Sequence, residues 1–316
     1  MNHKSAATIV VLVILFSLVS SCSYFDPQKA AGLGLQFVWT GSIVTDPPAI
    51  HMASFDDPAG TSHPVLGMND IPDTAFLNKV VISEPELRIY FITTEDNAGP
   101  VYPRIRRINY EGGDLEELYF LPEFRIIDVR SIAVDGNARL FFFTGMRDDQ
   151  KWGLYSVPTD SYEAPHELDL IDSGEYFDIT LDRVNRYVYF SRGETGFYKV
   201  NYDGGGLESE YLQMGDFDPP PLVQQISLDK SGNTLYFTDS TAGIFSVNAQ
   251  DGHDGRLIEP EPDIDKIAVD SITNRIFYLS TLSESIWILQ EGDLPRIFFS
   301  TDPNGPITDF AIEYIP

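Results

Sequence analysis

A pattern of about 45 residues recurs along this chain, and it limits the possible folds more than any other feature. Its first part is a short apolar strand that ends in a carboxylate, found at residues 132–135, 179–182, 226–229, 267–270 and 310–313. A sixth copy, at 80–83, has Ser83 in place of the acid. Aromatic strands follow, and the second residues of their aromatic pairs, Phe91, Phe142, Phe190, Phe237 and Tyr278, lie 51, 48, 47 and 41 residues apart. This period predicts the four-stranded blades of a β-propeller.

The two ends of the chain complete one blade between them. The last copy of the first strand, at 310–313, is not followed by three further strands, but the N-terminal region offers three, at 37–40, 49–53 and 63–66. We therefore predict an all-β fold: a six-bladed β-propeller of four-stranded antiparallel blades over residues 35–316, with its ring closed by N- and C-terminal strands in one blade. This closure leaves no open sheet edge.

Four segments carry a resemblance to a known family, namely 109–113, 185–191, 201–205 and 235–239. They resemble the YWTD propellers of low-density-lipoprotein-receptor-like ectodomains and the related bacterial TolB-like propellers. Only the unit at 235–239 keeps the Thr-Asp ending, and no unit has the Tyr-Trp pair. The resemblance therefore implies the architecture and no particular ligand.

The first residues have the features of an export signal. Lys4 precedes an apolar run at 9–19 that suits a signal peptide and is too short for a comfortable membrane span. The run ends in Val-Ser-Ser-Cys22, which resembles the lipobox of bacterial lipoproteins, and Cys22 is the only cysteine of the chain. A lone exported thiol is a liability unless it carries a lipid. We expect a lipoprotein signal peptide at 1–21 and a lipidated tether at 22–34.

The charge and composition of the chain limit the classes of partner that it can bind. The chain has 48 acidic and 21 basic residues, a net charge of −27, so its surface repels nucleic acid and anionic headgroups. Hydrophobic residues make up 43% of the sequence, enough for a large core, which excludes a disordered chain. Ser23 follows the lipobox cysteine, and a residue other than Asp there favours the outer membrane. The expected location is thus the bacterial cell envelope, lipid-anchored, with no nucleic acid as partner.

The repeated acids Asp135, Asp182, Asp229 and Asp270 occur once per blade at the same place, before the turn into the second strand. A catalytic centre should break the symmetry of a repeat, whereas an Asp that caps a turn can recur in every blade. We interpret the four as turn caps. No histidine pair has metal-ligand spacing, and motifs of hydrolases and phosphate loops are absent. The sequence predicts no catalytic residue, no metal site and no cofactor.

Candidate binding residues are the positions that break the repeat. The residues that enter the first strands should ring one end of the central channel: Lys79, Ser131, Asp178, Gln225, Lys266 and Asp309. Connections between blades add aromatic and charged candidates on the same face: Phe124, Arg125, Tyr176, Phe177 and Phe217. The alternative for each aromatic is that it packs over the end of a blade.

These observations predict a lipid-anchored cell-envelope protein that binds or scaffolds with the loop face of its propeller. The partner would be an envelope protein, a glycan or a small molecule. The lipid on Cys22 would anchor the protein in the membrane. The alternative is a metal-dependent propeller enzyme of the lactonase or hydrolase type, with its site at the channel mouth. Because the ring mixes two acids with two lysines, we favour binding over catalysis.

Overall fold

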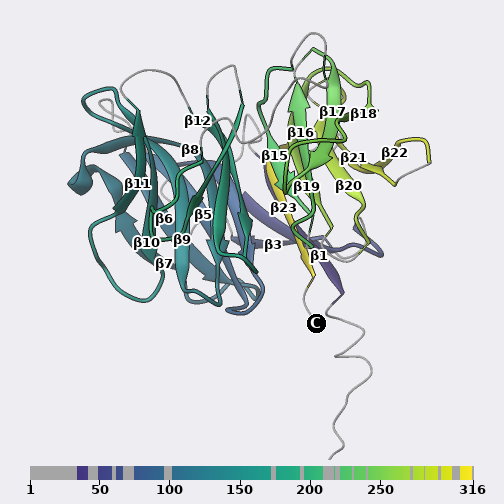
Figure 1. Ribbon diagram of the computed structural model, residues 1–316. Helices are drawn as coiled ribbons and strands as arrows, with labels where there is room; N and C mark the ends of the chain where they lie inside the picture. The colour runs from purple at the N-terminus through teal and green to yellow at the C-terminus, as the bar shows by residue number, and fades with distance from the viewer. Residues whose placement is uncertain are drawn as a thin grey trace, which may run out of the picture.

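The strands of the protein form six antiparallel sheets arranged around a common axis in the computed structural model (Figure 1). The residues that the structure describes are 34–41, 49–58, 62–66, 75–95, 102–171, 176–192, 196–208, 217, 221–229, 231–239, 241–270, 273–280, 282–290, 293–300 and 307–314. Cys22 and the predicted signal peptide lie outside them. The predicted all-β six-bladed propeller is confirmed.

Each blade is one sheet. Blade 1 contains β23 (Ile307–Tyr314), β1 (Leu35–Gly41), β2 (Ala49–Ser54) and β3 (His63–Leu66). Blade 2 contains β4 (Ala75–Ser83), β5 (Arg88–Glu95), β6 (Tyr102–Asn109) and β7 (Glu116–Phe120), and the 3₁₀ helix η1 (Leu121–Phe124) follows. Blade 3 contains β8 (Ile126–Asp135), β9 (Leu140–Arg147), β10 (Trp152–Pro158) and β11 (His166–Ile171).

The second half of the ring repeats the arrangement. Blade 4 contains β12 (Tyr176–Asp182), β13 (Tyr187–Arg192) and β14 (Phe197–Asn201). Blade 5 contains β15 (Ile226–Leu228), β16 (Thr234–Asp239), β17 (Gly243–Asn248) and β18 (Arg256–Glu259). Blade 6 contains β19 (Ile264–Val269), β20 (Ile276–Ser280), β21 (Ser285–Leu289) and β22 (Arg296–Ser300).

Blade 1 joins the two ends of the described chain, as predicted. Its strand order is β23-β1-β2-β3, and β1 pairs antiparallel with β23 from Leu35 opposite Tyr314 to Thr40 opposite Asp309. The two strands lie side by side in Figure 1. The ring is thereby closed through a full strand pairing without a disulfide.

Blade 4 differs from the predicted four strands within the described residues. Its sheet has three strands, and Glu208 forms an isolated bridge to Lys199 of β14 where a fourth strand would run. Glycine precedes this point at 204–206, with Gly204 and Gly206 at positive φ. Glycine costs more backbone entropy to order than other residues, which weakens strand pairing there.

The core lies between the faces of adjacent blades. Strands in the middle of a blade are covered on both faces, so they carry aromatic runs, as in β9, where Phe141, Phe142 and Phe143 are fully buried. Phe141 packs against Tyr90 of blade 2 with ring centroids 5.7 Å apart. Outer strands such as β18 and β22 are mostly exposed or half-buried. Within the described ranges, no helix is long and apolar enough to cross a membrane.

The first strands of the blades line a central cavity of about 520 Å³. They are β4, β8, β12, β15, β19 and β23. The upper end of the cavity is the end where these strands begin, and the lower end is where they turn into the second strands. Leu35 and Tyr314 pair at the lower end, and Thr40 and Asp309 pair at the upper end.

Candidate functional site

Four of the six predicted ring residues, Asp178, Gln225, Lys266 and Asp309, lie at or beside the start of a first strand, at the upper end. Lys79 and Ser131 lie in the middle of the longer strands β4 and β8. The exposure of the six residues differs from the expectation of an open channel mouth. Ser131, Asp178 and Asp309 are buried, at 2%, 4% and 1% exposure, while Lys79, Gln225 and Lys266 are half-buried.

Three of these side chains bond the backbone of the following blade. The bonds run from the Val80 N–H to Asp309 Oδ2 at 2.8 Å, from the Ile179 N–H to Ser131 Oγ at 3.2 Å and from the Ile226 N–H to Asp178 Oδ2 at 2.9 Å. First strands are sheet edges, and their inward N–H groups need partners. An acceptor at the ring position of one blade thus satisfies the edge of the next blade and joins the two.

The lysines of the ring neutralise these carboxylates. Lys266 Nζ lies 3.2 Å from Asp309 Oδ1. Burial raises the pKa of Asp178, opposed by the charge of Lys266 and the hydrogen bond from Ser131. Burial lowers the pKa of Lys266, but the carboxylates of Asp309 and Asp178 outweigh it and leave the pKa raised. Lys79, Asp178, Lys266 and Asp309 form what we term the charge cluster, and two of them, Asp178 and Lys266, line the cavity.

A hydroxyl near the end of the second strand supports three of the ring positions, and these hydroxyls were not among the predicted site residues. Thr144, Ser191 and Thr238 are fully buried. Their oxygens accept the N–H groups of ring residues at 3.1 Å each, from Ser131, Asp178 and Gln225 respectively. A partial signal was present, since a Ser or Thr stands one or two residues after the aromatic pair at positions 93, 144, 191, 238 and 280. In blades 2 and 6, however, the residues opposite the ring lysines are Ile92 and Leu279.

The first strands also carry β-bulges just before the ring positions. Register shifts fall between Leu77 and Lys79, between Val129 and Ser131, and between Ile264 and Lys266. A bulge adds one unpaired residue and re-aims its side chain. The residues skipped in these shifts are Asn78, Arg130 and Asp265.

Two of the skipped residues line a second hollow, beside the charge cluster. This hollow, which we term the upper groove, has a volume of about 430 Å³. Its lining includes Phe76, Asn78, Lys79, Asp128, Arg130 and Thr308. The groove lies between blades 1, 2 and 3, and Lys79 belongs to both the groove and the charge cluster.

The connection residues fall into two groups. Phe177 lies beside the groove, with the Arg130 guanidinium 5.6 Å from its ring. Tyr176 is fully buried, and its hydroxyl donates to Asp169. Arg125 forms an exposed ion pair with Asp148 at 2.7 Å.

The other two aromatic candidates, Phe124 and Phe217, pack against neighbouring aromatic rings. This is the alternative stated above, in which an aromatic packs over the end of a blade. Phe124 is half-buried and contacts Tyr119 and Tyr162, with ring centroids 6.4 and 5.7 Å apart. Phe217 packs edge-on against Phe237 and Phe245, at 6.0 and 5.2 Å. Each ring covers the end of a blade core.

The lower end of the cavity is crossed by an ion pair. Arg183 of the turn after β12 lies 3.1 Å from Glu313 of β23, and blades 4 and 1 face each other across the ring. Arg183 also donates to the Val134 carbonyl at 3.2 Å. The repeated acids lie at this end as turn caps, as predicted: Asp135 accepts the Ala138 N–H, Asp182 the Asn185 N–H and Asp229 the Asn233 N–H. Asp270 accepts from the side chains of Thr273 and Arg275.

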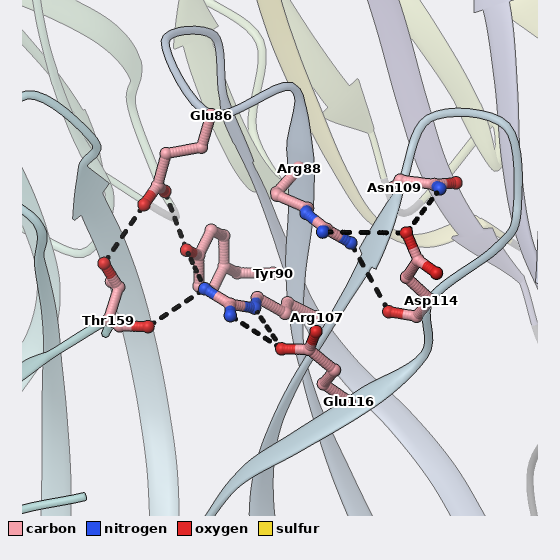
Figure 2. A network of polar contacts seen from close by, with 8 residues as sticks. All are labelled: Glu86, Arg88, Tyr90, Arg107, Asn109, Asp114, Glu116 and Thr159. Atoms are coloured by element: carbon pink, nitrogen blue, oxygen red, sulfur yellow. Dashed lines mark hydrogen bonds and ion pairs between the residues drawn. The ribbon is translucent and has the colours of Figure 1, made fainter. Parts of the chain in front are cut away.

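Polar side chains also join blades 2 and 3 near their lower ends (Figure 2). Tyr90 donates to Glu86 at 2.7 Å, and Thr159 donates to the other oxygen of Glu86 at 3.1 Å. Arg107 donates to the Thr159 carbonyl at 2.9 Å and to Glu116 at 2.8 Å. Burial and the hydrogen bond to Glu86 raise the pKa of Tyr90 to about 12. Each group is satisfied within the network, so we assign it to blade packing.

A metal-dependent enzyme would need several oxygen or nitrogen donors converging on one point. Among the described residues, no group of three His, Cys, Asp or Glu side chains is placed to hold a metal ion. The two carboxylates at the upper end, Asp178 and Asp309, already accept backbone N–H groups and face Lys266. A metal there would have to displace the bonds that join the blades.

Comparison with known proteins supports the fold and does not identify a family. No family model matches the sequence, and no curated protein matches it. A chain of the nidogen/laminin complex has a TM-score of 0.67 and 13% identity, over 88% of this chain and 98% of that one. TolB from Acinetobacter baumannii has a TM-score of 0.62 and 12% identity, over 88% of this chain and 66% of that one.

A puromycin-hydrolyzing peptidase from Mycobacterium tuberculosis is similar at a TM-score of 0.57 and 12% identity, over 84% of this chain and 45% of that one. At these identities the similarity concerns the fold alone. The protein is a six-bladed β-propeller that resembles the nidogen YWTD and TolB propellers.

Proposed function

We propose that this protein is a lipid-anchored binding or scaffold protein of the bacterial cell envelope, which holds its partner on the upper end of the propeller. One observation carries the choice of binding over catalysis. The carboxylates at the upper end are engaged in bonds between blades and with Lys266, while the upper groove beside them is open and lined by side chains of several kinds. Such a surface suits recognition.

The position of β1 gives the anchored protein an orientation. Leu35 begins β1 at the lower end, and twelve residues, 23–34, separate it from Cys22. That length of chain spans at most about 45 Å. A lipid on Cys22 would therefore keep the lower end toward the membrane and leave the upper groove directed away from it. The net charge of −27 keeps the propeller itself off an anionic bilayer.

The anchor is tested by replacing Cys22 with serine. Wild-type protein should fractionate with the outer membrane, and Cys22→Ser should leave the protein unprocessed or release it into the soluble fraction. Unchanged processing and unchanged attachment to the membrane would contradict the anchor.

The binding function is tested by capture from envelope solubilised in detergent, using the wild-type chain and a chain with Phe76→Ala and Arg130→Ala. The wild type should retain a partner that the double variant loses. Arg139→Ala, at an exposed ion pair with Asp160, is the control. Equal capture by all three proteins would place the partner elsewhere on the propeller.

The metal-dependent hydrolase remains the rival, since the fold also occurs in a peptidase. A ligand that binds only the native state raises the melting temperature by mass action. Calcium, magnesium, manganese and zinc should each leave the melting temperature unchanged if the charge cluster is structural. A rise with one of them that disappears in Asp178→Asn would favour the enzyme.

A further inference from the structure

The upper groove has the size of a small-ligand site, and residues from three neighbouring blades line it. Its volume of about 430 Å³ falls in the range of about 300–1,000 Å³ that is usual for ligand pockets. Three of its lining residues are skipped at register shifts, Asn78 in β4, Arg130 in β8 and Thr308 in β23. Bulges re-aim side chains and are frequent next to functional sites. Blades 2, 3 and 1 thus each contribute a re-aimed residue to one hollow.

The two cations that line the groove are already engaged. Lys79 faces two carboxylates, Asp178 and Asp265; burial raises the pKa of each, and the charge of Lys79 opposes that rise. The Arg130 guanidinium lies 4.8 Å from the centroid of the Trp152 ring, in a cation–π contact. Neither side chain requires an anionic ligand, while the positive charge of both at one hollow disfavours a cationic ligand. The groove therefore suits a neutral ligand.

Two acceptor oxygens of the lining remain available for such a ligand. Asp128 Oδ1 accepts the Val129 N–H at 2.8 Å, and in the part of the chain that the structure describes Oδ2 accepts no hydrogen bond. Asn78 donates its amide to Thr94 Oγ1 at 3.0 Å, which orients the side chain and leaves its carbonyl oxygen as an acceptor. Hydroxyl groups are neutral donors that match both oxygens. The expected ligand therefore carries hydroxyls.

An exposed aromatic ring forms another part of the lining. Phe76 of β4 is 54% exposed and lies two residues before Asn78, so the ring and the amide belong to the same strand. The face of a phenylalanine ring is apolar and can cover the C–H face of a sugar, whose hydroxyls project from its edge. A saccharide is a neutral ligand that combines an apolar face with hydroxyl donors, and it fits all three features of the groove.

We propose that the upper groove binds a neutral saccharide, with the face of the sugar ring on Phe76 and sugar hydroxyls donating to Asp128 and Asn78. This inference rests on the proposed binding function and names the chemistry of its ligand. A terminal or short neutral glycan is the expected form, because the groove is a small hollow between blades.

Titration calorimetry with the detergent-solubilised full chain tests the inference. The probes are glucose and galactose, each with its uronate and its amino-sugar analogue, and the disaccharides maltose, cellobiose and lactose. At least one neutral sugar should bind. Its uronate and its amino sugar should bind no more tightly, because the groove offers neither a free cation nor a carboxylate without positive neighbours.

Paired variants locate the binding in the groove. Phe76→Ala should weaken the binding of the neutral sugar about tenfold, whereas Tyr162→Ala, which removes a ring that is 55% exposed outside the groove, should leave it unchanged. Asp128→Asn should also weaken it about tenfold, since an acceptor oxygen is lost. Asp148→Asn removes an equal charge at an exposed ion pair and should have no effect. The melting temperature of each variant shows whether it is folded.

Three results would overturn the inference. Binding of a uronate or an amino sugar at least tenfold more tightly than its neutral parent would show a charged site. Equal sugar binding by the wild type and folded Phe76→Ala and Asp128→Asn would place the sugar elsewhere, and binding of none of the sugars would remove the ligand class. If the wild type still captures an envelope protein that the double variant of the capture experiment loses, the proposed binding function stands and only the saccharide fails; loss of both would contradict the binding function as well.

Discussion

Replacing Asp309 with alanine removes the side chain that joins the closing strand β23 to blade 2. Its carboxylate is 1% exposed, accepts the Val80 N–H at 2.8 Å and lies 3.2 Å from Lys266 Nζ. Removing one partner of a buried ion pair costs about 3–5 kcal/mol, because the other charge stays buried without compensation. The orphaned N–H of Val80 is part of this cost.

The free energy of unfolding should therefore fall by about 3–5 kcal/mol in Asp309→Ala. At about 2 °C per kcal/mol, the value for long chains, the melting temperature should fall by about 6–10 °C. Differential scanning calorimetry measures it. Asp160→Ala, at the exposed ion pair with Arg139, is the matched control and should change stability by less than about 1 kcal/mol.

The double variant Lys266→Met with Asp309→Leu distinguishes the contribution of the ion pair to stability from the contribution of side-chain packing. Replacing both charges removes the desolvation penalty of each, so the double variant should be more stable than the sum of the two single variants predicts, by about 1–3 kcal/mol. If Asp309→Ala lowers the melting temperature no more than Asp160→Ala, the charge cluster does not join the blades and its assignment is wrong.

Three further changes test the fold. Thr144→Val removes the acceptor of the Ser131 N–H and should cost about 1–3 kcal/mol in chemical denaturation, because a buried donor is left unpaired. Gly243→Ala should destabilise the protein strongly in the same assay, since Gly243 has φ of +121° and an added Cβ would lie 2.0 Å from a carbonyl oxygen. Raising the pH from 10 to 12 should lower the melting temperature. The reason is that tyrosines of the unfolded chain ionise near pH 10, whereas the pKa of Tyr90 in the folded chain is raised to about 12. The variant Tyr90→Phe should therefore show a smaller decline of the melting temperature over this pH range.

Each of these changes has a matched comparison. Thr93 of β5 lies one residue beyond the position in blade 2 that corresponds to Thr144, and within the described residues its buried hydroxyl has no hydrogen-bond partner, so Thr93→Val should be neutral or stabilising. Equal losses in Thr93→Val and Thr144→Val would contradict the role of the hydroxyl. A Cβ added at Gly34 would have no heavy atom within 4 Å, so Gly34→Ala should leave the free energy of unfolding unchanged. Unchanged pH dependence in Tyr90→Phe would show that other tyrosines set the alkaline limit.

The architecture was predictable because a propeller repeats one local solution. An apolar strand, a turn acid and an aromatic strand recur once per blade, so each copy confirms the others, and the closure of the ring followed from counting strands at both ends. The turn-capping role of Asp182 and its relatives was predictable for the same reason.

The site was predictable only as a set of positions. Alternation and spacing place Asp178 and Lys79 at the same end of the ring, but not their burial, which depends on the side chains of neighbouring blades. Asp178 lines the central cavity, as expected of a channel-facing group, but it is buried there and bonds the blade that follows it. The upper groove depends on bulges at Asn78 and Arg130, which no local pattern in the sequence marked. The burial of the ring residues and the shape of the upper groove both depend on contacts between residues that are far apart in the sequence.

Site-specific photocrosslinking at the two ends of blade 2 measures which end of the propeller contacts the partner. A photoreactive residue would replace Phe76, which is 54% exposed at the upper groove, or Leu87, which is 50% exposed in the turn at the lower end of blade 2. In intact cells, we expect crosslinks to an envelope partner or glycan from position 76 and none from position 87. Crosslinks from position 87 alone would show that the partner lies on the lower end of the propeller and would contradict binding at the upper groove.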